Sequence, residues 1–375
     1  AVASIAAVGG KFKYRGGGAF WSNRIIFNWN KNVVEGNDVL DNSIRMLDMS
    51  RIGPILTYED ELVRQGPPVT AMLIQNTNPA AVAPDTHRVL RGFRREDLFL
   101  CVHEQLMTET ANMADIVLPA TTFLEHDDLY QAAGQVHVQV HRAVIKPPGE
   151  TRSNHWVLCQ LAQRLGASHE GFEMTEWELV DRTLRDSGWP GAEELLQKRW
   201  LDVQPSFDKA HFLEGFPTAN GKFKFSADWS ALGPLGHQLP SLPDYCPNID
   251  LATRDKPFRM ITSPARNFLN SSFTETPTSK KREGRPEVMI HPEAASKLNI
   301  LSGDRVRLGN EQGSVVLHAL LFEGVQKDVI VVESVWPNAA FEEGIGINAL
   351  ISAEAGAPNG GAVFHDTAVW VSKIK

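Results

Sequence analysis

Cysteine is scarce in this chain of 375 residues. Cys101, Cys159 and Cys246 lie far apart, and no CxxC or CxxH spacing occurs. This excludes a recognisable zinc or iron–sulfur motif within the chain, and so few cysteines do not suggest a disulfide scaffold. The usage favours a reducing compartment, the cytoplasm rather than the periplasm, without determining the localisation.

Long apolar runs and an excess of positive charge are also missing. No apolar run approaches the roughly 20 residues that a membrane-spanning helix needs, and no signal peptide is recognisable. The formal net charge is −8, so no overall basic field favours nucleic acid or an anionic membrane. With 42% hydrophobic and 22% charged residues, the composition predicts a soluble globular protein without direct membrane insertion.

An initial methionine is absent, since the chain begins "AVASIAAVGGKFKYRGGG". We therefore expect a fragment whose natural N-terminus, with any targeting signal, is missing. At 375 residues the chain is nevertheless too long for one ordinary core, and two or three domains are expected.

Between Gly66 and Leu118, short apolar runs alternate with helix-like segments. Continuously apolar strands separated by helices are typical of a parallel sheet covered on both faces. We therefore predict an α/β domain here. Its predicted strands are 69–74, 98–102 and 115–118, and its predicted helices are 85–92 and 108–113.

The pattern changes to β after residue 257. Short strands such as 288–290 alternate with regular turns, and one small helix begins at Pro292. This pattern predicts a closed barrel. Between the two regions we predict helices 156–165, 175–186 and 192–200, a hairpin turning at Asn220-Gly221, and a proline-rich connection over 233–257. The predicted domains are 1–165, 166–256 and 257–375.

Polar side chains follow two of the predicted parallel strands. Asn76 and Asn78 come after the first strand, and Glu104 comes after the second. Ligands of open parallel sheets bind beyond the carboxyl ends of the strands. The two amides can offer hydrogen bonds there, and Glu104 can accept hydrogen bonds from ribose hydroxyls. A turn at Asn-Pro and a solvated Glu104 are the structural alternatives.

The segment "TET" opens the next predicted helix, where the hydroxyls of Thr108 and Thr110 and backbone N–H groups suit a phosphate. Asp115 begins the third strand and can recognise a base edge if its loop folds back. Thr108 as a plain N-cap is the alternative. Together these residues point to a nucleotide-like ligand, although no GxGxxG or P-loop is present.

The barrel region offers one further candidate, and catalytic or metal sites find little support. Arg266 lies among Asn and Ser side chains, a combination suited to phosphate or a polar heterocycle, or simply a surface arginine. His137 and His141 would lie about 13 Å apart on one strand, too far for one metal ion. No Ser/His/Asp or Cys/His arrangement can be assembled, so we name no catalytic residue.

In the order in which its motifs occur, the chain resembles the C-terminal part of a molybdopterin oxidoreductase of the DMSO reductase family. The resemblance covers nearly the whole chain. It rests on "GGKFKYRGGG", "NTNPAAVAPD", "HEQLMTETANMADIVLPATTFLEHDD", "AVIKPPGETRSNHWVLCQLAQRLG", "TANGKFKFS", "IHPEAASKLNILSGDRVRLGNEQGSV" and "GINAL".

The resemblance implies that the first part belongs to a dinucleotide-binding Rossmann-like α/β domain, here incomplete, and the last part to a double-psi β-barrel. It also implies two molybdopterin guanine dinucleotides that carry molybdenum or tungsten. In this family the iron–sulfur cysteines and the protein ligand to the metal come from the N-terminal half, so the chain alone should be inactive. A small-molecule substrate and an iron–sulfur subunit for electron transfer are the implied partners.

The family's cofactor-binding positions can be carried over residue by residue. Those in the α/β part are Asn76, Asn78, Glu104, Thr108, Thr110 and Asp115, and those in the barrel are Arg266, Asn270, Ser272, Asn348 and His365. His365 stands where a lysine is common, and it makes a weaker or pH-dependent cation. The family's Asn-x-Glu-Gly-Arg segment is replaced by "QAAGQVH", which removes a charged contact.

We therefore expect the cofactor-binding part of an enzyme that performs two-electron redox chemistry or oxygen-atom transfer. The alternative is a non-catalytic pterin- or nucleotide-binding scaffold subunit that lacks the redox half. An unrelated barrel protein would leave the ordered N-terminal matches unexplained. Substrate and metal cannot be chosen from the fold.

Overall fold

A computed structural model describes residues 2–20, 22–246 and 250–374, and the structural statements below concern these residues. Contacts group the chain into two compact units. Unit 1 comprises residues 1–44, 118–227 and 241–244, and unit 2 comprises residues 45–117, 228–240 and 245–375. Both units are discontinuous along the chain, whereas the three predicted domains are continuous, and the domain boundaries remain a prediction.

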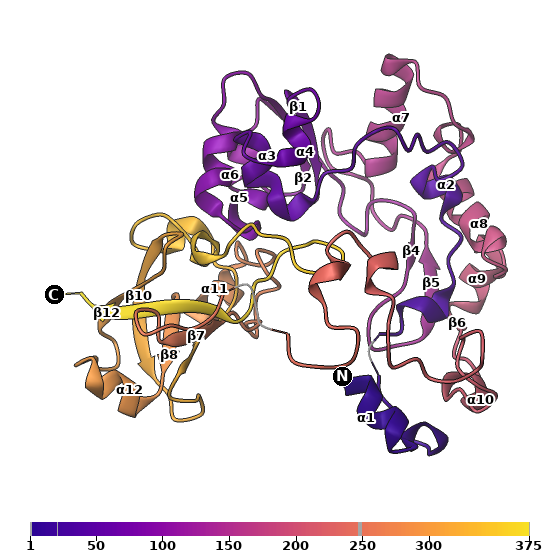
Figure 1. Ribbon diagram of the computed structural model, residues 1–375. Helices are drawn as coiled ribbons and strands as arrows, with labels where there is room; N and C mark the ends of the chain where they lie inside the picture. Colours follow the sequence, from indigo (N-terminus) through magenta and orange to yellow (C-terminus); the bar gives the residue numbers. More distant parts are fainter. Residues whose placement is uncertain (1, 21, 247–249, 375) are drawn as a thin grey trace. The chain divides into compact units, whose positions relative to one another are not determined.

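A three-stranded sheet with the order β1-β2-β3 confirms the predicted α/β region (Figure 1). The strands are β1 (Ala71–Gln75), β2 (Phe99–Glu104) and β3 (Ile116–Pro119). β1 and β2 are parallel, with Ala71 opposite Phe99 and Gln75 opposite His103. Leu100 and Val102 on β2 are buried, as expected for strands inside a covered sheet.

Two helices beside this sheet pack closely because two glycines permit it. The helices are α3 (Ile52–Leu56) and α6 (Thr86–Phe93). A Cβ atom on Gly92 would lie 2.4 Å from Cβ of Leu56, and one on Gly53 would lie 2.8 Å from Cβ of Arg88. Any larger residue at either position would push the helices apart.

The prediction of a helix over residues 108–113 is wrong. The structure has only a single 3-10 turn, Ala111–Met113. The backbone N–H of Thr110 donates to the side chain of Asn78, and β3 begins at Ile116. The segment is therefore held by tertiary hydrogen bonds and leaves too few residues for an α-helix.

Six strands of unit 2 form the predicted closed barrel, a double-psi β-barrel with the order β10-β8-β11-β7-β12-β9. Pairs β10·β8 and β11·β7 are parallel, and the other four pairs of the barrel are antiparallel. Large side chains such as Met260, Ile290 and Leu317 are fully buried in its core. The strands are β7 (Phe258–Ile261), β8 (Glu287–Ile290), β9 (Arg305–Gly309), β10 (Ser314–Leu321), β11 (Val329–Val332) and β12 (Thr367–Lys373).

Short helices complete unit 2. They are α4 (Glu61–Arg64), α5 (Pro79–Val82), α11 (Pro277–Glu283) and α12 (Pro292–Lys297). The small barrel helix expected at Pro292 is confirmed as α12. Residues 247–249 of the predicted connection lie outside the described residues.

Unit 1 combines a small antiparallel sheet with helices. The sheet has the order β4-β5-β6, and Val138, Leu184 and Leu195 are central in its core. The predicted helices are confirmed: Gly166 ends α7 with a φ of 70°, and Thr175 begins α8 with a capping box. The elements are α1 (Val2–Val8), α2 (Asn32–Glu35), β4 (Asp128–Tyr130), β5 (His137–His141), α7 (Asn154–Leu165), α8 (Glu176–Asp186), α9 (Ala192–Lys198), β6 (Leu201–Asp202) and α10 (Phe207–Ala210).

The hairpin predicted at Asn220-Gly221 is present only as a turn. Gly221 donates to the carbonyl of Thr218 (3.0 Å) and accepts from the N–H of Phe216 (2.8 Å), but residues 216–226 form no strand. The ring of Phe216 packs against those of Phe12 and Phe223. Aromatic packing therefore holds this segment in place of a strand ladder.

Within the described part of the chain, no helix combines the length and the apolar character needed to cross a bilayer.

Candidate functional site

Asn78 is buried and connects two loops at the carboxyl edge of the sheet. Its Oδ1 accepts hydrogen bonds from the backbone N–H (3.1 Å) and the hydroxyl (2.8 Å) of Thr110. Its Nδ2 donates to Oε2 of Glu109 at 2.8 Å. The hydroxyl oxygen of Thr110 also accepts from the N–H of Ala80 at 3.0 Å. The predicted ligands Asn78 and Thr110 are therefore engaged with one another.

Glu109, to which the sequence assigned no role, extends this network into the barrel. Its Oε1 accepts from the backbone N–H of Asn338 at 3.0 Å. The side chain of Asn338 in turn donates to the carbonyl of Ala80 (3.0 Å) and accepts from the N–H of Gly346 (2.8 Å). The resulting linkage of Asn78, Glu109, Thr110 and Asn338, here called the buried amide linkage, ties the α/β part of unit 2 to its barrel.

The remaining predicted residues of the α/β part do not gather at one edge. Glu104 ends β2 and accepts a hydrogen bond from the N–H of Gln105 (2.7 Å). Asp115 instead accepts from the N–H of Leu100 (2.7 Å), near the start of β2. Leu100 and Glu104 are about 13 Å apart by strand rise. The two carboxylates therefore do not share the carboxyl edge.

Thr108 and Asn76 have local roles. The hydroxyl of Thr108 accepts from the N–H of Ala111 at 3.2 Å, which is the capping alternative. Asn76 is exposed and has a φ of 52°, a left-handed conformation that Asn tolerates well. Its backbone N–H donates to the carbonyl of His103 at 3.1 Å. Asn76 thus shapes the turn after β1.

A large open cavity of about 1560 Å³ lies in unit 2. This volume exceeds the roughly 300–1,000 Å³ typical of small-ligand sites, so a ligand of dinucleotide size is compatible with it. The wall combines loops of the α/β part, the segment before α3 and loops of the barrel. It includes Met46–Arg51, Glu59–Leu62, Val82, Pro84, Pro234, Leu235, Gln238, Thr262–Pro264, Asn270, Ser334, Val335, Asn348, Glu354, Ala355, Asn359–Ala362, Phe364 and His365.

Three of the predicted barrel residues line this cavity: Asn270, Asn348 and His365. Asn348 is buried, and its Nδ2 donates to the carbonyl of Ala81 at 2.9 Å. Asn270 is exposed, and its side chain makes no hydrogen bond among the described residues. Arg266 and Ser272 are exposed and are not part of the wall.

Ser334 is the wall residue that most clearly indicates a ligand. It is 5% exposed, yet its hydroxyl has no hydrogen-bond partner among the described residues. Its φ of 71° is strained for a residue with a Cβ atom, and its N–H donates to the carbonyl of Ser263 at 2.8 Å. A buried hydroxyl without a partner is uncommon and costly, so the cavity offers it a place for a polar ligand atom.

Asp48 and two glycines shape another part of the wall. Oδ2 of Asp48 accepts from the N–H of Gly361 (2.8 Å), and Oδ1 accepts from the N–H of Ser50 (2.9 Å). Burial raises the pKa of the Asp48 carboxyl, but these hydrogen bonds outweigh burial and hold the pKa below its usual value. Gly360 has a φ of 89°, and a Cβ atom there would lie 2.5 Å from the Asp48 carboxylate. The close approach therefore requires glycine.

Two of the five acidic residues of the wall are paired with arginines. Asp60, which is buried, pairs with Arg51 at 2.5 Å. Glu59 pairs with Arg88 (3.0 Å) and Arg91 (2.7 Å). These pairs reduce the repulsion that an anionic ligand such as a diphosphate would otherwise meet.

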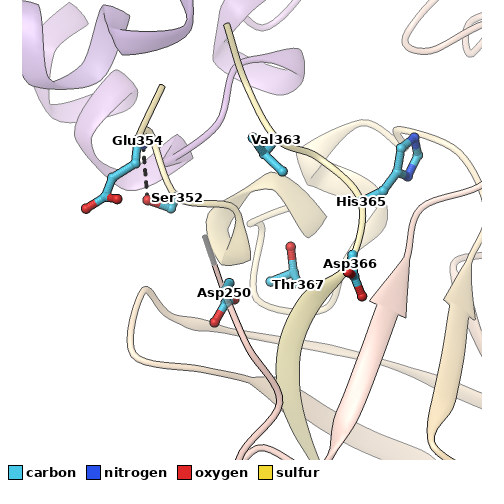
Figure 2. A pocket seen from close by; sticks show the side chains of 7 residues that line it. All are labelled: Asp250, Ser352, Glu354, Val363, His365, Asp366 and Thr367. Atoms are coloured by element: carbon cyan, nitrogen blue, oxygen red, sulfur yellow. Dashed lines mark hydrogen bonds between the residues drawn. The ribbon is translucent and has the colours of Figure 1, made fainter. Parts of the chain in front are cut away.

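A small recess of about 10 Å³ adjoins the large cavity, since Glu354 and His365 line both. Figure 2 shows Asp250 and Thr367 at its base, with the ring of His365 turned away from them. Nδ1 of His365 lies 3.4 Å from the hydroxyl of Thr262. A recess of this size holds about one water molecule and no larger ligand.

Sequence reasoning missed most of the wall, including Asp48, Ser334 and Gly360. The run "APNGG" at residues 357–361 was the available signal, because adjacent glycines mark close backbone approaches. Nothing in the sequence distinguishes Ser334 from any other serine after a strand, since its lack of a partner is a property of the folded chain.

Two family models match the chain. The model described as "Molybdopterin oxidoreductase" matches residues 21–164, and the model described as "Molydopterin dinucleotide binding domain" matches residues 258–368.

Known proteins resemble the chain in sequence and in fold. The "Probable oxidoreductase YoaE" of Bacillus subtilis is 31% identical over 100% of this chain and 54% of its own length. The "Dimethyl sulfoxide/trimethylamine N-oxide reductase" of Rhodobacter capsulatus is 26% identical over 69% of this chain and 35% of its own length. The structure of acetylene hydratase from Pelobacter acetylenicus matches with a TM-score of 0.70 and 18% identity, covering 88% of this chain and 47% of the other.

The likeness to acetylene hydratase, at 18% identity, shows the fold alone. The chain spans about half the length of the first curated relatives that it matches, 54% for each of two Bacillus subtilis proteins. The two family models, the oxidoreductase relatives and the double-psi barrel agree with one another. The chain belongs to the molybdopterin oxidoreductases of the DMSO reductase family.

Proposed function

We propose that this chain is the C-terminal, cofactor-binding part of a longer molybdenum or tungsten oxidoreductase, and that the large cavity of unit 2 holds molybdopterin guanine dinucleotide. The observation that carries this proposal is the buried, unpartnered hydroxyl of Ser334 in the cavity wall. A ligand rich in polar atoms removes the cost of leaving that hydroxyl without a hydrogen bond.

Several wall residues are suited to hold such a ligand. Ser334 can donate to a phosphate or pterin oxygen, and Asn270 offers an amide that no other described residue uses. Gly360 and Gly361 present backbone where a Cβ atom on Gly360 would crowd Asp48. His365 adds an imidazole side chain to the wall. These residues bind and orient the dinucleotide.

The bound metal supplies two-electron redox change or oxygen-atom transfer, while the protein positions and tunes it. Among the described residues, no group of three His, Cys, Asp or Glu side chains is placed to hold a metal ion. On the family resemblance, we infer that the metal ligand and the iron–sulfur cluster come from the N-terminal half of the longer enzyme, and that an iron–sulfur subunit for electron transfer is its partner. The chain by itself is then inactive, and two dinucleotides are bound only in the whole enzyme.

The test compares Ser334→Ala with Thr86→Val in the full-length protein. The hydroxyl of Thr86 is also buried and has no partner within the part of the chain that the structure describes, but Thr86 does not line the cavity. Loss of one ligand hydrogen bond should speed cofactor release about tenfold for Ser334→Ala and leave Thr86→Val unchanged. Release is followed by the fluorescence of the freed pterin, and equal rates in both variants would remove Ser334 from the site.

A second measurement tests whether this chain binds the metal without the rest of the enzyme. The 375-residue chain, expressed alone and analysed for elements, should hold far less than one molybdenum or tungsten per chain. One metal ion per chain would show that this part binds the metal without the rest of the enzyme.

A further inference from the structure

Unit 1 carries a basic aromatic patch that the proposed cofactor role does not use. It is built from two chain segments, 9–18 and 207–227, which lie about two hundred residues apart in the sequence. Each contains the tripeptide Lys-Phe-Lys, at 11–13 and at 222–224. The patch consists of Lys11, Phe12, Lys13, Arg15, Lys209, Phe212, Phe216, Lys222, Phe223 and Lys224.

Aromatic contacts bring the two tripeptides together. The ring of Phe12 meets that of Phe216 edge to face at 5.5 Å, and Phe216 meets Phe223 in the same way at 5.3 Å. The ring of Phe12 also contacts that of Phe212 at 5.8 Å, and Nδ1 of His211 lies 2.6 Å from the carbonyl oxygen of Phe12. In Figure 1 the first segment follows α1, and the second begins with α10.

All six basic side chains of the patch are exposed, and none forms an ion pair among the described residues. Lys13 lies over the ring of Tyr14 and Arg15 over that of Phe207, each at 5.1 Å. Some other exposed cations of this chain are paired with carboxylates, such as Arg305 with Glu342 and Lys327 with Glu293. The two patch segments contain six basic and two acidic residues, in a chain whose net charge is −8. The patch segments are therefore positively charged, whereas the chain as a whole is negatively charged.

We propose that the basic aromatic patch docks an acidic surface of a protein partner. Five of its six cations are lysines, which are strongly hydrated point charges suited to the polar rim of a transient interface. The phenylalanine rings supply an apolar centre, and a patch of opposite sign to the partner increases the rate of association.

Two other anionic partners fit less well. Single-stranded nucleic acid is bound by bases stacking on available rings, whereas Phe12, Phe212, Phe216 and Phe223 are half-buried against one another. An anionic membrane and a nucleic acid would both be repelled by the remainder of a chain with a net charge of −8. A protein partner needs to match only the patch itself.

The test uses the full-length protein and a fluorescent oligoglutamate peptide as the acidic probe. The variant Lys11→Gln/Lys13→Gln/Lys222→Gln/Lys224→Gln removes four charges from the patch. The matched control, Lys280→Gln/Lys281→Gln/Arg282→Gln/Arg285→Gln, removes four exposed charges on and after α11 in unit 2. At low ionic strength, we expect the patch variant to bind the peptide about tenfold more weakly, and the control to bind within about twofold of the parent.

Phosphatidylserine vesicles and a single-stranded oligonucleotide of equal charge are tested in parallel. If the control variant also bound the peptide more weakly, the net charge of the protein would explain the effect, and the proposal would be overturned. Tighter, patch-dependent binding of the vesicles or the oligonucleotide would also overturn it, in favour of that partner class. Unchanged peptide binding in the patch variant would exclude the patch, provided that both variants unfold at the parent's temperature.

Discussion

The buried amide linkage and the cavity wall around Ser334 differ in how their polar atoms are used. In the linkage, Asn78, Glu109 and Asn338 bond to one another and to backbone groups. In the wall, Ser334 is as buried as Asn78, yet its hydroxyl bonds to nothing in the described chain. Satisfied buried polar groups stabilise the fold, whereas an unsatisfied one marks a place where a ligand can contribute.

The difference revises how the segment "TETANMAD" is interpreted. Its oxygen-rich side chains predict a ligand site, yet Thr110 and Glu109 hold the α/β part against the barrel of unit 2. Their direct contact with a cofactor remains a prediction. Their structural role is visible, and it places the cavity wall by fixing the loops behind it.

The largest effect should follow from breaking the linkage at Asn78. In Asn78→Ala the buried N–H of Thr110 loses its partner, and the side chain of Glu109 loses one of its two partners. We expect the free energy of unfolding to fall by about 3 kcal/mol, measured by urea denaturation. Asn76→Gly, which keeps the positive φ at an exposed position, should change it by less than about 0.5 kcal/mol. Equal losses would mean that the linkage contributes no special stability.

A smaller effect is expected at Glu109. Glu109→Ala leaves the N–H of Asn338 and Nδ2 of Asn78 unpaired, at a cost of about 2 kcal/mol. Glu109→Gln keeps an acceptor and should cost about half as much. Glu104→Ala is the matched control, since among the described residues its carboxylate accepts a hydrogen bond from the N–H of the neighbouring Gln105 alone, and it should have little effect. Thermal and urea denaturation of the three variants would reveal any departure from this order.

Removal of the unpartnered hydroxyls should not lower the free energy of unfolding, in contrast to the linkage variants. Without cofactor, Ser334→Ala and Thr86→Val both remove a buried group that makes no hydrogen bond. The free energy of unfolding should stay equal or rise by up to about 1 kcal/mol in each. A loss of more than 1 kcal/mol in Ser334→Ala would show that its hydroxyl has a partner inside the protein. The comparison between wall and linkage would then fail.

The smallest effect concerns Asp48 and depends on pH. Its folded-state pKa lies below the ordinary value, so its contribution to stability is present above the unfolded pKa and is lost as the pH falls through the folded pKa. Asp48→Asn should therefore lower the melting temperature slightly at pH 6, and the difference should shrink as the pH falls towards 2.5. Glu354→Gln is the control, because that carboxylate accepts no hydrogen bond among the described residues. A difference that does not shrink between pH 6 and pH 2.5 would exclude the carboxylate as its cause.

Much of the fold follows from local patterns. The apolar runs near residues 71–75 and 99–104 and the alternation in 305–309 and 314–321 predict strands because side-chain periodicity is a local property. Gly166 and Thr175 likewise mark helix ends through their own backbone and side-chain chemistry. The predictions failed at 108–113 and 216–226, where hydrogen bonds and ring contacts to distant residues override the local preference.

The amino-acid sequence by itself determined the strands, most helices, the barrel and the family resemblance, since these depend on periodicity and motif order. Only the tertiary structure decided that Asn78 and Thr110 bond to one another, that Ser334 has no partner, and that two distant Lys-Phe-Lys tripeptides form one patch. Whether a polar atom is available to a ligand depends on every neighbour that the fold brings to it. That information is absent from any single stretch of sequence.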